Sequence, residues 1–310
     1  MPNAMFFSNT GDRPDLAKLE VNPPEGYIGF AIAPKYEATE KSGSLWYFPL
    51  TADTAAQTGR SPGVAPTAVQ IASTNTSFSC AELFKRAAMT PDELTQIGDE
   101  AKAEVALTRH AKRSVLAAIE ALVATATVGG TPADTTFDAA SFLVQIQDAL
   151  DATKGHGGKT VLVAGAATLR KLVQKLLAEE SVGPMLARVV SGTAPNVATQ
   201  GLSLAAWKAA LQTLAGVDDV LIGDSAVWSA GSNAGRIAIG RISTGEDQLD
   251  HKYEAVFAKT VLFLPKGAET EWSVRVVADE INQNNYVDAT IWAAVKTLNA
   301  GAMYVIDGVA

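Results

Sequence analysis

The part of the chain whose residue types come nearest to a site of chemistry is residues 154–160, with the order Lys-Gly-His-Gly-Gly-Lys-Thr. Its Gly-Lys-Thr ending is that of a phosphate-binding P-loop, in which backbone N–H groups and a lysine hold a nucleotide. The leading glycine of that motif would fall at position 153, which is Thr153. A P-loop also needs a strand before it and a helix after it, whereas here a helical pattern precedes and a strand-like run follows. We therefore expect a turn between a helix and a strand.

Residues 161–167 (Val-Leu-Val-Ala-Gly-Ala-Ala) pass from a strand-like run into a helical pattern, as dinucleotide-binding sites do. They lack the spaced glycines that let a pyrophosphate approach the backbone. Residues 154–170 nevertheless leave one alternative open, an α/β enzyme that binds a nucleotide there.

Metal and nucleophile chemistry has little support. The three histidines, His110, His156 and His251, stand far apart, and Cys80 is the single cysteine, so no metal-ligand spacing exists. Cys80 is expected to be a small buried residue, and Ser225 lacks the Gly-x-Ser-x-Gly setting of a hydrolase nucleophile. We expect no catalytic residues, no metal and no cofactor, and a protein that is not an enzyme.

The composition sets the class of protein. Hydrophobic residues make up 47% of the 310 residues and charged residues 19%, which is enough to bury a core. The net charge of −8 gives no overall attraction to nucleic-acid phosphates. No apolar run approaches the roughly 18–20 residues that cross a bilayer, and the first residues lack a signal-peptide pattern. We expect a soluble intracellular protein with no membrane partner.

The first quarter of the chain reads as extended. Residues 1–35 are rich in Pro and Gly and predict an arm with a short strand at 27–32. Strand-like runs at 44–50 and 68–78 flank a Thr-, Ala-, Gly- and Pro-rich connection at 51–67. So long a connection is uncommon inside a compact domain, which predicts a projecting hairpin. Because an isolated hairpin is only marginally stable in water, we expect this one to need a surface outside itself.

A very long helix follows. Thr90, Pro91 and Glu93 form a helix start with a capping box, and no proline appears again until residue 132. A continuous helix would be roughly 50 Å long, far longer than the mean of about 11–12 residues, with Gly98 as the place for a kink. Two apolar ridges are predicted along it: Leu94, Ile97, Ala101 and Val105, then Leu107, Ala111, Val115, Ala118 and Leu122.

The rest of the chain first alternates between predicted helices and strands and then consists mostly of predicted strands. Helical periodicity and short apolar runs predict a mixed α/β region over residues 138–245, with helices at 139–150, 167–178 and 203–215 and strands at 160–164, 220–222 and 236–242. From about residue 254 the chain is mostly β, with candidate strands at 256–264, 271–277, 291–296 and 303–306.

This order of arm, hairpin, long helix, α/β region and strands resembles the major capsid proteins of tailed bacteriophages, the Hong Kong 97-type coat fold, which encapsulin shells share. The stretch 272–276 with Asn282, Tyr286 and residues 300–302 is similar to the C-terminal regions of those coat proteins. The resemblance implies an α+β fold whose parts are an N-terminal arm (1–35), an extended loop or E-loop (36–78), a spine helix with the start of a peripheral (P) domain (79–135), an axial (A) domain (136–250) and P-domain strands with a C-terminal return (251–310).

The same resemblance implies a function. It is that of a major capsid protein, which self-assembles as hexamers and pentamers into the icosahedral shell around the double-stranded DNA of a tailed phage. It implies a portal, a separate scaffolding protein or none, a cement protein in some members, and no sequence-specific DNA binding. The expected location is the virion, assembled in the cytoplasm of a bacterial host. An encapsulin-type cellular nanocompartment is the alternative.

Two sets of residues are candidate contacts between subunits. Strand alternation sends Trp46 and Phe48 to one face of the hairpin and Tyr47 to the other, and a thin hairpin has no core of its own. The basic group Arg109, His110, Lys112 and Arg113 faces packaged nucleic acid or an acidic neighbour, or is a solvated face. The candidate contacts are Trp46, Tyr47, Phe48, Arg60, Val69, Ile71, Arg109 and Arg113.

Overall fold

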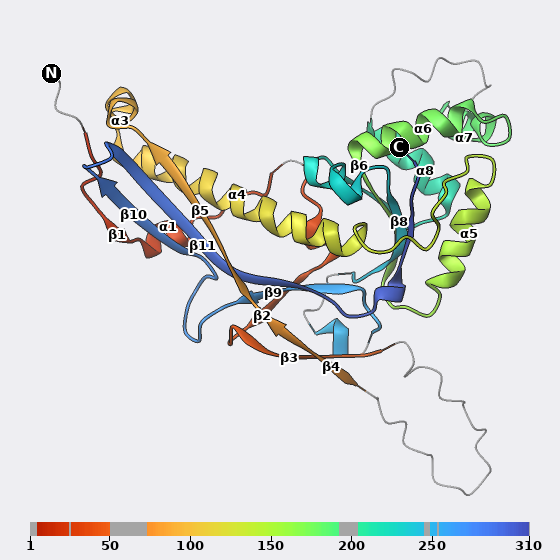
Figure 1. Ribbon diagram of the computed structural model, residues 1–310, viewed down its shortest axis with the longest axis horizontal. Coiled ribbons are helices and arrows are strands. Elements are labelled where there is room, and N and C mark those ends of the chain that lie inside the picture. The colour runs from red at the N-terminus through yellow and green to blue at the C-terminus, as the bar shows by residue number, and fades with distance from the viewer. Residues whose placement is uncertain are drawn as a thin grey trace, which may run out of the picture.

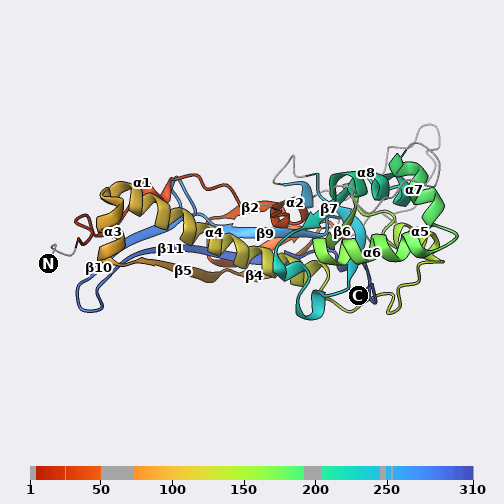
Figure 2. The ribbon, with the colours of Figure 1, turned by 90° about the horizontal axis from the view of Figure 1, so that it is seen from above.

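The protein is elongated and is built around one long helix. The structure is a computed structural model, and it describes residues 5–24, 26–49, 73–191, 204–244, 249–252 and 254–309. The helix α4 (Glu100–Thr127) runs along a twisted sheet and ends at an α/β part, where α5 to α8 gather (Figures 1 and 2). Within the described residues, no helix is long and apolar enough to cross a membrane.

The predicted long helix is two helices. The short helix α3 (Pro91–Ile97) begins with the expected capping box, in which the Thr90 side chain accepts from the N–H of Glu93. It ends at Gly98, whose φ of 66° is left-handed and closes the helix. Asp99 then caps α4 by accepting from the N–H of Lys102 at 3.1 Å. The continuous helix from residue 90 is therefore wrong, because Gly98 stops it instead of bending it.

The predicted apolar ridges are right only in the middle of α4. Leu107, Ala111 and Val115 are buried against the sheet. Ile97 is 44% exposed and Leu122 is 42% exposed. The break at Gly98 gives α3 its own orientation, and towards its end α4 turns its buried side to the α/β part.

The main sheet has six described strands in the order β1-β10-β11-β9-β2, with β5 paired to β11. Their bounds are β1 (Gly11–Asp12), β2 (Lys35–Ala38), β5 (Ala81–Met89), β9 (Ala258–Phe263), β10 (Ser273–Asp279) and β11 (Asn284–Thr297). The strand β11 pairs with β10 along one edge, with β5 along the other, and with β9 near its end. Alternate residues of β11, among them Val287, Ala289 and Ile291, are buried on the side of α4.

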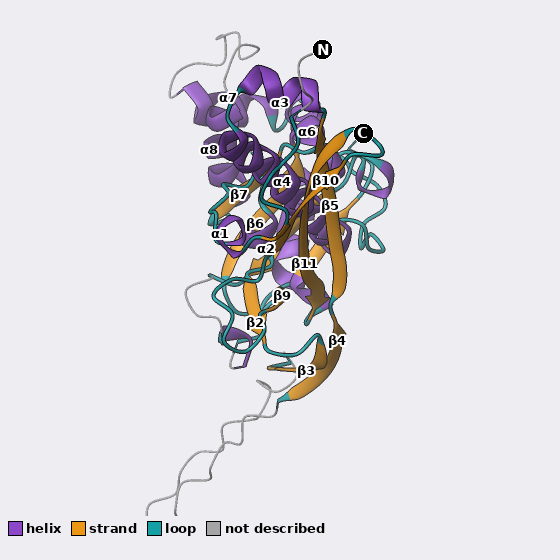
Figure 3. Ribbon diagram, turned by 90° about the vertical axis from the view of Figure 1, so that its left-hand side faces the viewer, coloured by secondary structure: helices purple, strands orange, loops and turns teal. Residues whose placement is uncertain are grey.

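The hairpin forms a separate pair of strands. β3 (Ser42–Tyr47) and β4 (Thr74–Ser79) pair antiparallel, with Leu45 opposite Thr76. They lie at one edge of the molecule, away from the helices of the α/β part (Figures 1 and 3). The predicted strands are confirmed here, although residues 50–72 lie outside the described residues.

The α/β part has a sheet of four described strands in the order β12-β8-β6-β7. These are β6 (Lys159–Gly165), β7 (Asp219–Gly223), β8 (Ile237–Ile242) and β12 (Met303–Ile306). The helices beside them are α5 (Phe142–Ala152), α6 (Ala166–Ala178), α7 (Gly183–Ser191) and α8 (Leu204–Ala215). All of these elements except α7 were predicted from periodicity.

Two expectations for the rest of the chain fail. The segment 27–32 is not a strand, because α2 (Gly29–Ile32) makes one helical turn that buries Ile32 completely. The strand β5 was not predicted at all, since only Ala87 of its nine residues is buried. The other short helices are α1 (Pro14–Ala17) and the 3-10 turns Ala226–Trp228, Gly231–Asn233, Asp250–Lys252 and Ala300–Ala302.

The packing of α4 on the sheet is testable by a matched pair of substitutions. Ile119 is fully buried between α4 and the sheet, so Ile119→Ala should lower the free energy of unfolding by about 2–5 kcal/mol. The exposed Ile97 should tolerate Ile97→Ala with a change within about 0.5 kcal/mol. Urea denaturation measures both, and equal losses would contradict the assignment of the two faces.

Candidate assembly surfaces

The base of the hairpin is anchored on the chain's own sheet. Leu45 is 1% exposed and Phe78 is 7% exposed, whereas Trp46, which follows Leu45 on β3 and points to the opposite face, is 51% exposed. Leu45 and Phe78 pack with residues of the main sheet and its flanks: Ala38, Cys80, Val256, Val261 and Leu298. The hairpin therefore covers one end of the sheet face that lies opposite α4. We expected the hairpin to need a surface outside itself, and at its base the main sheet of the same chain provides that surface.

Polar contacts fix both ends of the hairpin base. The N–H of Phe48 donates to the carbonyl of His251 at 2.7 Å, and the Asn299 amide donates to the Phe48 carbonyl at 3.3 Å. The ammonium of Lys41 lies 3.4 Å from the ring centroid of Trp292, which is a close cation–π contact. These contacts hold β3 in a defined direction as it leaves the sheet.

The hairpin residues predicted as contacts are placed as follows. We call the apolar cluster around Leu45 and Phe78 the base cluster; Tyr47 packs against it, and Trp46 points the other way into solvent. Phe48 is half-buried beyond the end of β3. Arg60, Val69 and Ile71 lie outside the described residues. Cys80 is 4% exposed, as expected, and burial raises the pKa of its thiol.

A buried charged cluster lies directly under the hairpin. Lys259 and Asp250 are almost fully buried, with Lys259 Nζ 2.6 Å from Asp250 Oδ1, and Ser243 donates to the other carboxylate oxygen. Burial alone would raise the pKa of Asp250, but hydrogen bonds from His251, Lys259 and Ser243 lower it to about 2. The His251 ring meets Tyr36 edge-on, 5.1 Å between centroids. Through Lys259 on β9, Tyr36 on β2 and His251, whose carbonyl accepts from the N–H of Phe48, the cluster connects these two strands to the point where the chain leaves β3, which we call the hairpin exit.

The remaining part of that sheet face is open. We call it the open sheet face and define it by Phe84, Arg86, Tyr286 and Asp288. Arg86 binds Asp288 through two hydrogen bonds of 2.7 and 2.8 Å and lies 4.7 Å from the Tyr286 ring centroid. Phe84 is 47% exposed. None of the described helices covers these residues, so Phe84 and Arg86 are exposed and Tyr286 is half-buried, while Asp288 is 8% exposed.

The predicted basic group on α4 is only partly exposed. Arg109, His110 and Arg113 are exposed on the side away from the sheet. Lys112 is 1% exposed and donates to the carbonyls of Ala17 and Leu19 at 2.7 and 2.9 Å. Burial lowers its pKa to about 8. Lys112 therefore has a structural role and connects the N-terminal segment to α4. The prediction that it belongs to an exposed basic group is wrong.

The glycine-rich segment is a closed turn. It lies between α5 and β6, as expected, and His156 within it is buried. At the start of α6, Gly165 packs so closely against Ser229 Oγ and the Trp228 carbonyl that a side chain there would collide with them. Among the residues that the structure describes, no group of His, Cys, Asp and Glu is suited to hold a metal ion.

No protein-family model and no curated protein matches the chain. Among solved structures, a phage-related protein from Bordetella bronchiseptica is similar with a TM-score of 0.65 at 14% identity, over 97% of this chain and 98% of that one. A virus-like particle from Pyrococcus furiosus has a TM-score of 0.48 at 10% identity, covering 89% and 90% of the two chains. Mycobacterium phage Che8 has a TM-score of 0.49 at 14% identity, covering 99% and 95%.

The first of these likenesses spans both chains nearly end to end and shows a shared fold. The structure has the predicted α+β fold, with an N-terminal segment, a hairpin, a long helix on a sheet and an α/β part in the expected order, and the phage-related protein shares this fold.

The buried cluster gives a prediction about acid stability. The lowered pKa of Asp250 means that its carboxylate stabilises the fold fully above the ordinary pKa of 3.8, and that this contribution is lost as the pH falls towards 2. We expect Asp250→Asn to lower the free energy of unfolding by about 3–5 kcal/mol at pH 7, because Lys259 is left buried without its partner.

The loss caused by Asp250→Asn should shrink between about pH 5 and pH 2, measured by urea denaturation at each pH. The exposed Asp148 on α5 provides the matched control, Asp148→Asn, with a change within about 0.5 kcal/mol throughout. A loss for Asp250→Asn that is the same at pH 2 and pH 7 would contradict the account.

Proposed function

We propose that the chain is the major capsid protein of a tailed phage, and that many copies close into an icosahedral shell around double-stranded DNA. The end-to-end fold likeness to a phage-related protein supports this. The observation that carries it is the two-layer build, in which α4 covers one face of the main sheet and leaves the open sheet face in solvent. A monomer gains nothing from that exposed aromatic face, whereas a neighbouring copy can bury it.

The parts of the chain take the following roles in this proposal. Residues 1–35 are the N-terminal arm and residues 36–78 are the E-loop, which reaches a neighbouring subunit. Residues 79–135 and 251–310 form the P domain around the spine helix, and residues 136–250 form the A domain at the centre of the capsomer. The anchored base under Leu45 and Phe78 supports this division, because it fixes the direction in which the hairpin leaves its own subunit.

The other elements of the proposal follow from this role. The chain works by assembly and not by catalysis, and no residue is assigned a catalytic task. Its partners are other copies in hexamers and pentamers, a portal, and in some systems a scaffolding or cement protein. The particle forms in the host cytoplasm and the chain ends in the virion. Weak single interfaces suffice, because every subunit makes many at once.

Size-exclusion chromatography followed by negative-stain microscopy tests the proposal. Capsomers or closed shells are expected, alone or with the scaffolding protein of the same phage. A strictly monomeric species under both conditions would refute it. The alternative, an encapsulin-type compartment with the same fold, is separated by the contents of the particles, which are enzyme cargo instead of packaged DNA.

Trp46 and Leu45 give a matched test of the hairpin as a contact. Trp46→Ser should leave the free energy of unfolding within about 0.5 kcal/mol of the wild type, because the side chain is half in solvent, and should lower the yield of shells. Leu45→Ala should instead destabilise the subunit by about 2–5 kcal/mol, because Leu45 is in the base cluster. Denaturation and sedimentation measure the two effects. Full shell yield with Trp46→Ser would remove Trp46 from the contacts.

A further inference from the structure

Beyond its first turn, the outward face of α4 carries only cationic charge, whereas at its start Asp99 caps the helix and pairs with Lys102. Between residues 101 and 127 the exposed charged or titratable side chains are Lys102, Arg109, His110 and Arg113. Both carboxylates of this stretch are turned inward. Glu104 binds Arg13 at 2.7 Å, and Glu120 accepts from Trp228 Nε1 at 2.8 Å. An acidic chain of net charge −8 therefore presents a cationic surface along its longest helix.

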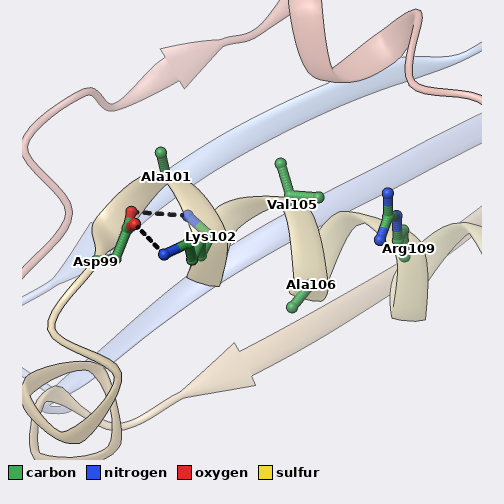
Figure 4. Close-up of a pocket in the computed structure, with 6 residues that line it drawn as sticks. All are labelled: Asp99, Ala101, Lys102, Val105, Ala106 and Arg109. Carbon is green, nitrogen blue, oxygen red and sulfur yellow. Dashed lines mark hydrogen bonds and ion pairs between the residues drawn. The ribbon is translucent and has the colours of Figure 1, made fainter.

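The cations form a line. Lys102, Arg109 and Arg113 are separated by seven and four positions, which places them on one side of the helix, opposite the sheet. At 1.5 Å per residue they are about 10 Å and about 6 Å apart along the axis. Figure 4 shows Lys102 and Arg109 on this surface, with the small side chain of Ala106 between them. Lys85 on β5 alternates with Leu83 and Ala87, so it lies on the same side of the sheet as α4.

Two of these cations are available for a partner. Lys102 forms an ion pair with Asp99 at 3.0 Å. Arg109 and Arg113 form no ion pair with any residue that the structure describes. Guanidinium groups suit phosphate oxygens because their planar N–H donors bind two oxygens at once.

We infer that the outward face of α4, defined by Lys102, Arg109 and Arg113, is a sequence-independent contact for the phosphate backbone of nucleic acid. This rests on the proposed function, in which one side of the subunit faces the packaged DNA. The hairpin and the open sheet face lie on the other side of the sheet, so copies that cover them leave the outward face of α4 free. Two or three phosphate contacts per subunit hold DNA weakly, which suits a shell that must later release it.

Fluorescence anisotropy with a labelled DNA duplex of about 30 base pairs and purified subunits, over a series of salt concentrations, tests the inference. Each lost phosphate contact reduces the slope of log affinity against log salt by about 0.9. We therefore expect Arg109→Ala with Arg113→Ala to make the slope shallower by about 2 and to weaken binding at low salt. The matched control is Arg170→Ala with Lys171→Ala on α6, which removes the same charge from two other exposed residues and should keep the wild-type slope.

An unchanged slope for the α4 variant, or an equal loss in the α6 control, would overturn the inference. Sedimentation of both variants gives a second readout, in which shells are expected as for the wild type. If the α4 variant binds DNA normally and fails to form shells, the surface meets another copy and the inference is wrong. A wild-type chain that forms no shells would count against the proposed function, while the DNA titration would still decide the role of Arg109 and Arg113.

Discussion

The constraint on which the structure depends is that one helix covers one face of one sheet. A sheet must bury at least one face, and here α4 does this with Leu107, Ala111, Val115 and Ile119 over β11 and its neighbours. Antiparallel sheets tolerate a second face in water, but this one carries Phe84 and Tyr286 there. In this two-layer arrangement, α4 buries one face of the main sheet, and among the described residues no layer of the same chain lies over the open sheet face.

The long helix also holds the rest of the chain, through buried charges. Glu104 binds Arg13 of the N-terminal segment, and Lys112 binds the carbonyls of Ala17 and Leu19. Near the other end, Glu120 accepts hydrogen bonds from Trp228 of the α/β part and from the N–H of Ile28. Buried charges are stable only when they have partners. These contacts therefore connect three segments that are distant in the sequence to α4. The charged side chains that stay exposed on the helix include Arg109 and Arg113.

The sequence predicted what local patterns control. The capping box at Thr90, the helix-to-strand turn at 154–160 and most elements of the α/β part are set by residues near one another in the chain, and the structure has them. The strand β5 was missed because an edge strand on a sheet with an open face shows no clean alternation of apolar residues. The burial of Lys112 was missed because its partners are carbonyls about ninety residues away, and no periodicity on the helix reveals them. Gly98 shows a third limit: the residue was noted, but only its left-handed φ decides between a kink and a break.

The fold is fixed by cores that lie within one chain, whereas the hairpin exit, the open sheet face and the outward face of α4 acquire a purpose only with a partner. Hydroxyl-radical footprinting of the aromatic side chains, before and after assembly, tests the central claim most directly. The exposed Phe84 and Trp46 should be oxidised readily in free subunits, the half-buried Tyr286 to a smaller extent, and all three should be protected in shells, while the buried Phe142 is protected in both states. Equal oxidation of Phe84 and Tyr286 in the free and assembled states would show that the open sheet face stays in solvent and would contradict the account.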